Sequence, residues 1–455
     1  MKSLRRPPLE KIAFALSVLL LAFLGGYLVR DRGWFPHSLL QTAAGQADRV
    51  LTSSTGRPDF AETRTGVTAR AAATAREGAV EAEPALTLIT STWRDFGWSP
   101  GLKLMDRRGR VLHEWRVDPT ELFDDSVHRR GTDLSEQDVH GSMLLPNGDV
   151  VVNVEYAGSA RLDACGNVKW TVSEGNHHSV ARAADGSFWI PGVSEEREAR
   201  SERYPGPEGY PGLGGTIFHS LVLQVSPDGE LLRTIPVLDL LYENDLERFI
   251  PKNDQQDRND VLHLNDVEPL PPSLEGEYPM FEAGDLLVSL RNLDLVLVFD
   301  PDSLEVRWSA SRPFIMQHDP DWMGDGWIGV LDNNWDDTER GTMLGGSRIV
   351  AIQPHTDSTR VLFPTARSEP FYTAHRGKWE RLEKGNLLLA EADEGRVVEV
   401  APDGSTVWEW EAGAYDESSV PSVTRASRVG LSREEVASWP CSPGEGDGGD
   451  AGSSG

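Results

Sequence analysis

The sequence has little positive charge for its length. It carries 44 lysines and arginines against 72 aspartates and glutamates in 455 residues, which gives a net charge of −28. An acidic surface repels phosphate backbones, and this excludes nucleic acid as a partner. Apolar residues make up 39% and charged residues 25%, so the chain can build a sizeable core, as one large all-β domain or as two smaller domains.

Cysteine is also scarce, since only Cys165 and Cys441 occur. Export from the cytoplasm would permit a disulfide between them, and that bond would tie the C-terminal tail to the folded domain. Two free thiols are an equal alternative, because the sequence alone does not determine the pairing.

The chain has one long apolar run without charge, residues 12–29. As a helix it would span roughly 27 Å, close to the thickness of the hydrocarbon layer. More basic residues precede the run than follow it, which favours a cytoplasmic N-terminus at residues 1–11 and export of the rest. The sequence therefore predicts a single transmembrane signal anchor. A cleaved signal peptide is the alternative, but no small-x-small cleavage site follows the run closely.

Two segments lack a sustained apolar period. Residues 30–85 are rich in Ala, Thr, Gly and Arg, which predicts a flexible stalk. Residues 441–455 contain mainly Gly, Ser, Asp and Glu, which predicts a disordered tail. This leaves residues 86–440 as the folded domain.

One pattern recurs within residues 86–440: a strand, a turn rich in Asp and Gly, and a second strand that often ends in Trp. Asp and Gly supply the left-handed backbone and local hydrogen bonds that tight hairpins need. The six copies are Leu102–Trp115, Ala160–Trp170, Leu221–Ile235, Leu295–Trp308, Arg348–Phe363 and Arg396–Trp410. Six such units predict an all-β, six-bladed β-propeller preceded by one transmembrane helix. A β-sandwich or two barrels are the alternatives, but sandwiches lack repeats of this kind.

A histidine leads into the inner strand of five of the six units; these residues are His140, His178, His263, His318 and His375. The first unit is preceded instead by the segment 86–91, which is expected to complete the ring as its inner strand. Because the innermost strands of a propeller line its central channel, the five histidines should converge on one face. A repeated structural role, as in WD-type propellers, is the alternative, although the paired Trp-Asp signature is absent.

Two further residues are expected to join this cluster. Asn265 lies two positions after His263 and would point to the same face of a strand. Arg291 ends an apolar strand, and its planar guanidinium would suit a tetrahedral anion. A surface salt bridge is an equal alternative for Arg291, and residues 332–334 are consistent with a simple turn.

Three short motifs resemble a known family. His263-Leu264-Asn265, Ser289-Leu290-Arg291-Asn292 and Gln317-His318-Asp319 are similar to motifs of the bacterial arylsulfotransferases, and the resemblance covers about residues 85–411. Members of that family are exported six-bladed propellers. They transfer a sulfuryl group from an aryl sulfate to a phenol through a sulfated histidine, without a nucleotide donor. Together with the anchor, the resemblance implies a single-pass protein of the bacterial inner membrane whose catalytic domain faces the periplasm.

The resemblance also implies catalytic roles. His318 corresponds to the nucleophile, and Arg291 corresponds to the sulfate-binding arginine. His263 and Asn265 correspond to the pair that helps bind the sulfuryl group and handles the phenol proton. A neutral imidazole is a competent nucleophile near pH 7, so the residue types suit this chemistry.

The remaining histidines, His140, His178 and His375, are expected to bind the substrate. The implied partners are an aryl sulfate donor, a phenolic acceptor and the membrane, with no cofactor and no metal.

Two other functions stay open at this stage. One is a histidine-rich metal site, because clustered imidazoles and carboxylates can hold zinc or iron. The other is a non-catalytic, membrane-anchored propeller for ligand binding or scaffolding. The sequence does not indicate the oligomeric state.

Overall fold

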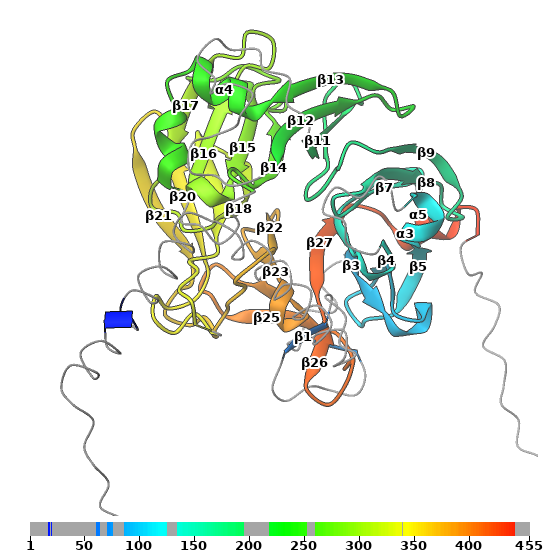
Figure 1. Cartoon of the computed structure of the whole chain (residues 1–455). Coiled ribbons are helices and arrows are strands. Elements are labelled where there is room, and N and C mark those ends of the chain that lie inside the picture. Colours follow the sequence, from blue (N-terminus) through cyan, green and yellow to red (C-terminus); the bar gives the residue numbers. More distant parts are fainter. Residues whose placement is uncertain are drawn as a thin grey trace, which may run out of the picture. The chain divides into compact units, whose positions relative to one another are not determined.

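The repeated hairpins form the outer strands of six antiparallel sheets, each with four blade strands. The computed structural model describes residues 17–18, 20, 61–63, 71–75, 86–124, 134–194, 218–252, 260–338 and 340–441. All six sheets belong to one compact unit that begins at residue 59. They are the blades of a six-bladed β-propeller, as predicted (Figure 1).

We number the blades in chain order and give their strands from the inside outwards. Blade 1 contains β27 (Val423–Val429), β3 (Leu86–Trp93), β4 (Ser99–Met105) and β5 (Val111–Arg116). Blade 2 contains β6 (Val139–Leu144), β7 (Val150–Val154), β8 (Gly158–Leu162) and β9 (Val168–Val172). Blade 3 contains β10 (Ala181–Arg182), β11 (Phe188–Ser194), β12 (His219–Val225) and β13 (Leu231–Pro236).

The second half of the ring follows the same scheme. Blade 4 contains β14 (Leu264–Pro269), β15 (Leu286–Leu290), β16 (Leu295–Phe299) and β17 (Val306–Ala310). Blade 5 contains β18 (His318–Gly324), β19 (Trp327–Asp332), β20 (Arg348–Gln353) and β21 (Ser358–Phe363). Blade 6 contains β22 (Lys378–Arg381), β23 (Leu387–Glu391), β24 (Arg396–Val400) and β25 (Thr406–Glu411). The six predicted hairpins are the outer strand pairs of these blades.

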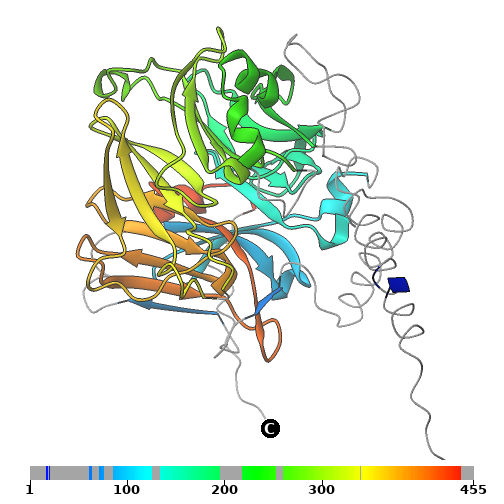
Figure 2. The same ribbon diagram turned by 60° about the vertical axis from the view of Figure 1, so that its left-hand side comes forward.

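Blade 1 joins the two ends of the folded domain. Its inner strand, β27, pairs antiparallel with β3, so that Val423 lies opposite Ser91 and Val429 opposite Leu86 (Figures 1 and 2). The prediction that segment 86–91 forms the inner strand is therefore wrong, because this segment is the second strand. Pairing a C-terminal strand with an N-terminal sheet closes the ring without leaving that edge open.

Two short strands from the predicted stalk pair with the propeller. β1 (Ala61–Thr63) pairs with β26 (Ser419–Pro421), and β2 (Ala72–Ala75) pairs with β25 at the outer edge of blade 6. For these two segments the prediction of a flexible stalk is wrong. They hydrogen-bond to main-chain groups that would otherwise form an open strand edge. The rest of 30–85 and tail residues 442–455 lie outside the described residues.

The predicted anchor is barely covered by the structure. Of residues 1–11 and 12–29, only residues 17, 18 and 20 are described, and these three are helical. Within the described part of the chain, no helix combines the length and apolarity needed to cross a membrane.

Adjacent blades pack face to face through apolar side chains. Six hydrophobic clusters of buried residues occur, one at each junction between neighbouring blades. A middle strand such as β16, with the sequence LVLVF, is buried throughout because both of its faces contact a neighbouring blade. This packing fixes the blades around the axis and therefore fixes where each inner strand begins.

Short helices lie in the loops between strands. They are η1 (Arg94–Phe96), α3 (Pro119–Leu122), η3 (Leu134–Glu136), α4 (Val237–Glu243), η4 (Glu247–Lys252), η5 (Glu275–Glu277), η6 (Arg291–Leu293), η7 (Ala392–Glu394) and α5 (Arg433–Ala437). The helices α3, η3, α4 and η4 occur in the two long connectors that enter β6 and β14. The predicted Pro/Gly-rich loop 204–215 lies outside the described residues.

The C-terminal helix α5 is attached to blades 1 and 2. It begins with a capping box in which Ser432 and Glu435 satisfy each other's backbone N–H groups. Trp439 packs against Trp115, with ring centroids 6.1 Å apart. Cys441 forms a disulfide with Cys165, which resolves the pairing that the sequence left open.

Candidate active site

The five predicted histidines lie where the chain enters the inner strands. His318 is the first residue of β18, and His140 is the second residue of β6. His263 directly precedes β14, while His178 and His375 lie three residues before β10 and β22. Equivalent positions of neighbouring blades lie side by side around a propeller axis, so these side chains come from five blades to one face.

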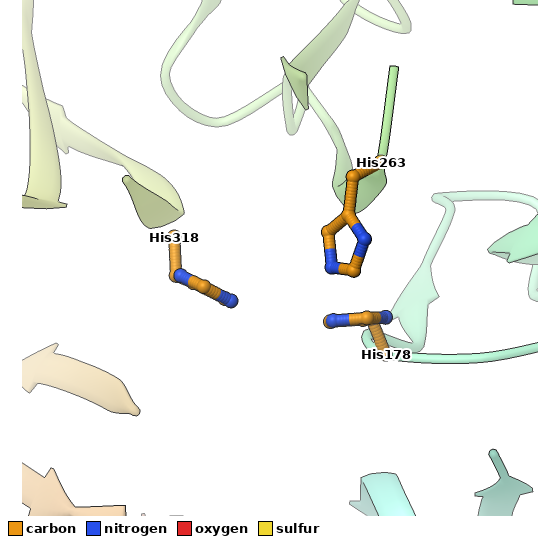
Figure 3. A group of neighbouring side chains, drawn as sticks. All are labelled: His178, His263 and His318. Atoms are coloured by element: carbon orange, nitrogen blue, oxygen red, sulfur yellow. The ribbon is translucent and has the colours of Figure 1, made fainter. Parts of the chain in front are cut away.

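His178 is at the centre of this cluster. Its ring centroid lies 4.0 Å from that of His140, 4.9 Å from that of His263 and 5.9 Å from that of His318. Figure 3 shows the rings of His178, His263 and His318 around a common space, each with a nitrogen turned toward it. His375 is more exposed but lies within electrostatic reach of His263 and Arg291. The structure thus brings the five histidines together.

A β-bulge occurs at the start of four of the six inner strands. An extra residue shifts the register with the second strand and can re-aim a side chain toward a site. The shifts lie between Val139 and Gly141, Leu264 and Asp266, His318 and Asp321, and Val423 and Arg425. The site is therefore built where the regular strand pattern is interrupted.

The backbone of His178 is held in an uncommon conformation. Its φ is 55°, in the left-handed region, which costs a residue other than glycine about 1 kcal/mol or more. Asn153 compensates, because its Nδ2 donates to the carbonyls of His178 and Ser179 at 3.1 and 2.8 Å. Gly141 is needed beside it, since a Cβ there would lie 1.6 Å from the His178 carbonyl oxygen.

His318 is held in one tautomer by Asn333. The Nδ2 atom of Asn333 donates to the carbonyls of Thr373 and Arg376 at 2.9 and 3.0 Å, so its Oδ1 must be the acceptor toward His318, 2.7 Å from Nδ1. His318 therefore carries its proton on Nδ1 and keeps a lone pair on Nε2. Burial and then the charge of Arg291 place the pKa of His318 well below its usual range, so the ring is neutral.

His263 is held by Asp260, a residue that the sequence analysis missed. The Nδ1 atom of His263 lies 2.6 Å from Oδ2 of Asp260, and its backbone N–H donates to Oδ1 at 3.1 Å. A carboxylate only accepts, so Nδ1 of His263 carries a proton and donates it to Asp260. The sequence signal that could have identified Asp260 is its position three residues before His263.

Arg291 lies beside this dyad. Its backbone N–H donates to the carbonyl of His263 at 3.0 Å, and its Nη1 donates to Oδ1 of Asn292 at 3.1 Å. Among the described residues no carboxylate forms an ion pair with Arg291, so the surface salt bridge considered above does not form. Partial burial and the charges of Arg291 and Arg376 lower the pKa of His375 to about 4. The site thus places the guanidinium of Arg291 beside the neutral imidazole of His318.

Asn265 connects two blades next to the nucleophile candidate. It is 1% exposed, and its Nδ2 donates to the carbonyl of Gln317, directly before His318, at 2.8 Å. Its Oδ1 has no hydrogen-bond partner among the described residues. Asn265 therefore fixes the chain that leads into β18, a contact that the motif alone did not indicate.

A buried lysine, Lys378, links the inner strands of three blades. Lys378 forms ion pairs with Asp266 at 2.5 Å and with Asp319, the residue after His318. Oδ2 of Asp319 also accepts the backbone N–H of Trp379 at 2.7 Å. One ammonium group therefore ties together the inner strands of blades 4, 5 and 6.

His177 is a second residue that the sequence analysis missed. Its Nδ1 lies 2.6 Å from Nδ1 of His178, and Tyr156 stacks on its ring at 4.8 Å. Burial, followed by the charge of neighbouring His263, lowers the pKa of His177 to about 3. The sequence signal that could have identified His177 as a site residue is its position next to His178.

The described residues include two groups with the composition of a metal site. Ring nitrogens of His178, His263 and His318 lie within 4.8 Å of one another, and the carboxylates of Asp138 and Glu155 lie near His140. The charge of Arg291 opposes a cation in the first group. In the second group, Arg376 pairs with both carboxylates, at 3.0 Å from Asp138 and 3.6 Å from Glu155, so an arginine already occupies the position of a cation there. The first group, next to Arg291, suits an anion better than a metal ion.

Several solved structures are similar to this chain. A protein of unknown function from Bacteroides caccae has 10% identity and a TM-score of 0.49, over 77% of this chain and all of that one. Streptogramin B lyase has 9% identity and a TM-score of 0.39, over 81% and 97%. The Pan2 WD40 domain of Neurospora crassa has 9% identity and a TM-score of 0.38, over 74% and 85%. Similarities this weak carry no argument about function, and no curated protein matches the chain.

Residues 141–413, more than half of the chain, match the family model described as arylsulfotransferase (ASST). The matched region contains four of the five clustered histidines and also Arg291, while His140 lies one residue before it. The match was expected from the motifs around His263, Arg291 and His318. The chain therefore belongs to the arylsulfotransferase family.

Proposed function

We propose that the protein transfers a sulfuryl group from an aryl sulfate to a phenol, with His318 carrying the group in between. Membership of the family supports a sulfotransferase-type enzyme. The single observation that supports the finer proposal is the Asn333–His318 hydrogen bond, which leaves a neutral imidazole with its Nε2 lone pair available. This is the state in which a histidine acts as a nucleophile.

In the first half-reaction Nε2 of His318 attacks the sulfur atom while the bond from sulfur to the aryl oxygen breaks. The leaving phenolate takes a proton from Nε2 of His263 in its imidazolium form, which the Asp260 carboxylate stabilises. Charge spreads over the three sulfuryl oxygens in the transition state, as in phosphoryl transfer, and the guanidinium of Arg291 stabilises it.

In the second half-reaction the acceptor phenol gives its proton to the now neutral His263. Its oxygen attacks the sulfur, and the bond from sulfur to Nε2 of His318 breaks. Protons and charge balance over the cycle, so the reaction needs no nucleotide, and donor and acceptor use the site in turn. Kinetics should be ping-pong.

The other predicted residues support this cycle. Asn265 holds the carbonyl of Gln317, and its second amide N–H is the group that can reach a sulfuryl oxygen. His178 lies across the site from His318, and His140 packs on the ring of His178. His375 lies toward solvent, on the side from which an aryl group would enter.

Intact and peptide mass spectrometry after incubation with 4-nitrophenyl sulfate tests the proposal. We expect an adduct of one SO₃ unit on the peptide that contains His318. The His318→Ala variant should form no adduct and release no 4-nitrophenol, whereas His355→Ala, which alters an exposed histidine in blade 5, should behave as wild type. An adduct on another histidine, or turnover by His318→Ala, would overturn the assignment.

We also propose that residues 12–29 anchor the enzyme in the bacterial inner membrane with the propeller in the periplasm. The support is the uncharged run and its basic N-terminal flank. Protease added to intact spheroplasts should remove the propeller domain. Complete protection of the domain would refute this placement, and release of a soluble mature form would replace the anchor with a cleaved signal peptide.

A further inference from the structure

The two adjacent imidazoles at the centre of the site share one hydrogen bond. Nδ1 of His177 lies 2.6 Å from Nδ1 of His178, and the two side chains are buried, at 2% and 3% exposed. A hydrogen bond between two ring nitrogens contains one proton, so one ring donates and the other accepts. Whichever ring donates decides what His178 presents to the site on its other nitrogen.

Packing leaves this pair little freedom to rearrange. Tyr156 stacks on His177 with an interplanar angle of 29°, and His140 covers His178 at 4.0 Å. The carbonyls of both histidines accept hydrogen bonds from Nδ2 of Asn153, at 3.4 and 3.1 Å. The pair is therefore held for a purpose other than filling space, since apolar side chains would pack there without needing partners.

Two proton arrangements are possible. If His178 donates from Nδ1, its Nε2 carries a lone pair into the site. If His177 donates, a neutral His178 must carry its proton on Nε2 and becomes a donor there. Burial lowers the pKa of both rings, of His177 to about 3 and of His178 well below its usual range, so a doubly protonated ring is not the alternative.

The surroundings favour the second arrangement. Asn333 fixes a lone pair on Nε2 of His318, whose ring lies 5.9 Å from that of His178 across the site. A second lone pair opposite it would be repulsive, whereas an N–H is attracted. The sulfuryl group of an aryl sulfate has only acceptor oxygens, so a donor is also what a bound substrate needs.

We infer that His177 is a positioning residue: it donates its Nδ1–H to His178 and so makes His178 an Nε2–H donor for the sulfuryl oxygens. This role rests on the proposed sulfuryl transfer. It gives the three facing imidazoles different tasks: His318 presents a lone pair, His263 exchanges a proton, and His178 donates. It also explains why a second buried histidine precedes His178.

The tautomer can be measured without any turnover. In the full chain labelled with ¹⁵N-histidine, long-range ¹H–¹⁵N spectra distinguish a protonated Nε2 from a protonated Nδ1. The His178 signals are assigned by their loss in His178→Gln. We expect His178 to be protonated on Nε2 and to respond to added inorganic sulfate. A His178 protonated on Nδ1 in the wild type would overturn the inference, even if the enzyme transfers sulfuryl groups normally.

Two variants of His177 test the consequence for binding. His177→Phe keeps an aromatic ring on Tyr156 but removes the donor, whereas His177→Asn retains an N–H near the position of Nδ1. We expect His177→Phe to weaken sulfate binding and to raise the donor KM about tenfold, with a smaller change in kcat, because a hydrogen bond to a charged group is lost. His177→Asn should restore both values. Equal values for wild type and His177→Phe would overturn the role, while a wild type that shows the Nε2–H tautomer but no sulfuryl transfer would refute the proposed function alone.

Discussion

Asn333 holds both the nucleophile candidate, His318, and the next blade, through its amide oxygen and both of its amide N–H groups. Its Oδ1 lies 2.7 Å from Nδ1 of His318, and its Nδ2 lies 2.9 and 3.0 Å from the carbonyls of Thr373 and Arg376. An amide flipped the other way would face two carbonyls with its oxygen, so the orientation is determined by the contacts. Blade packing and histidine tautomer are thus set by the same side chain.

Removing this acceptor should slow the chemical step, in addition to the loss of stability expected when the carbonyls of Thr373 and Arg376 lose their donor. In Asn333→Leu the ring of His318 is free to move its proton to Nε2, which leaves no lone pair for the sulfur atom. We expect kcat to fall about 10- to 100-fold, as for other groups that orient a reactive histidine. The decrease can be measured by following release of the donor phenol in a stopped-flow instrument. Asn386→Leu, in the turn between β22 and β23 of blade 6, is the matched control, and equal rates for the two variants would contradict the role.

Asp260→Asn should show a defect that depends on the leaving group. The amide cannot stabilise the imidazolium of His263, so a phenol that needs its proton on departure should suffer most. We expect a loss of about 100-fold or more with phenyl sulfate and a much smaller one with 4-nitrophenyl sulfate. Steady-state rates over a series of aryl sulfates measure this slope. Asp302→Asn, at a surface ion pair with Arg233, should leave the slope unchanged.

Arg291→Lys should be a severe change although it preserves the charge. An ammonium group cannot reproduce the two parallel N–H groups of the guanidinium. We expect kcat/KM for the donor to fall about 100-fold, comparable to the loss of one oxyanion donor. The control is Arg233→Lys, which changes a surface arginine. A mild effect at Arg291 would show that it does not contact the sulfuryl group.

The buried histidines should make the fold sensitive to acid. The folded-state pKa of His177 is about 3, below the unfolded value of about 6.5, so the unfolded chain binds more protons between these values. Stability therefore falls as the pH decreases through this window. Nearby His263 and His140 strengthen the shift in pKa, whereas Asp260 and Glu155 oppose it.

Comparison with the His177→Asn variant isolates the contribution of His177 to the pH dependence of stability. Relative to the variant, the wild type should lose roughly 3 kcal/mol of unfolding free energy between pH 6.5 and pH 4, from about 1.4 kcal/mol per pH unit. Urea unfolding at a series of pH values measures the difference. Parallel stability curves for the two proteins would contradict the prediction.

The disulfide should contribute to stability without affecting the chemistry. Cys165 and Cys441 are 276 residues apart, so the bond restricts a long loop of the unfolded chain. We expect reduction to lower the free energy of unfolding by about 2–4 kcal/mol. Cys165→Ser should show the same loss and no further response to reductant. A reduced wild type as stable as the oxidised one would contradict this.

Much of the architecture follows from the sequence alone. The hairpin copies, for example Leu295–Trp308, are recognisable because turn chemistry and strand pattern are properties of neighbouring residues. Repetition of the unit then indicates a ring, and the position of His140, His263 and His318 before an inner strand indicates the face on which they meet. The family motifs around His263 and His318 indicated the arylsulfotransferase family in advance.

Tertiary structure decided the rest, because it depends on contacts between residues distant in sequence. The segment 423–429 mixes small, polar and apolar residues, so its pattern did not mark it as the strand that closes the ring. The pairing of β1 and β2 with the propeller likewise depends on strand edges that exist only after folding.

The same holds for the proton arrangement of the site. A histidine's tautomer is set by whatever its second nitrogen touches, and for His318 that partner is Asn333, 15 residues away on the next strand connection. For His263 and His178 the partners are close in sequence, at Asp260 and His177, but only a left-handed backbone at both histidines turns the rings onto them. Composition and spacing determined which residues gather at the axis, whereas contacts made only in the folded chain decided which nitrogen of His318 carries the proton.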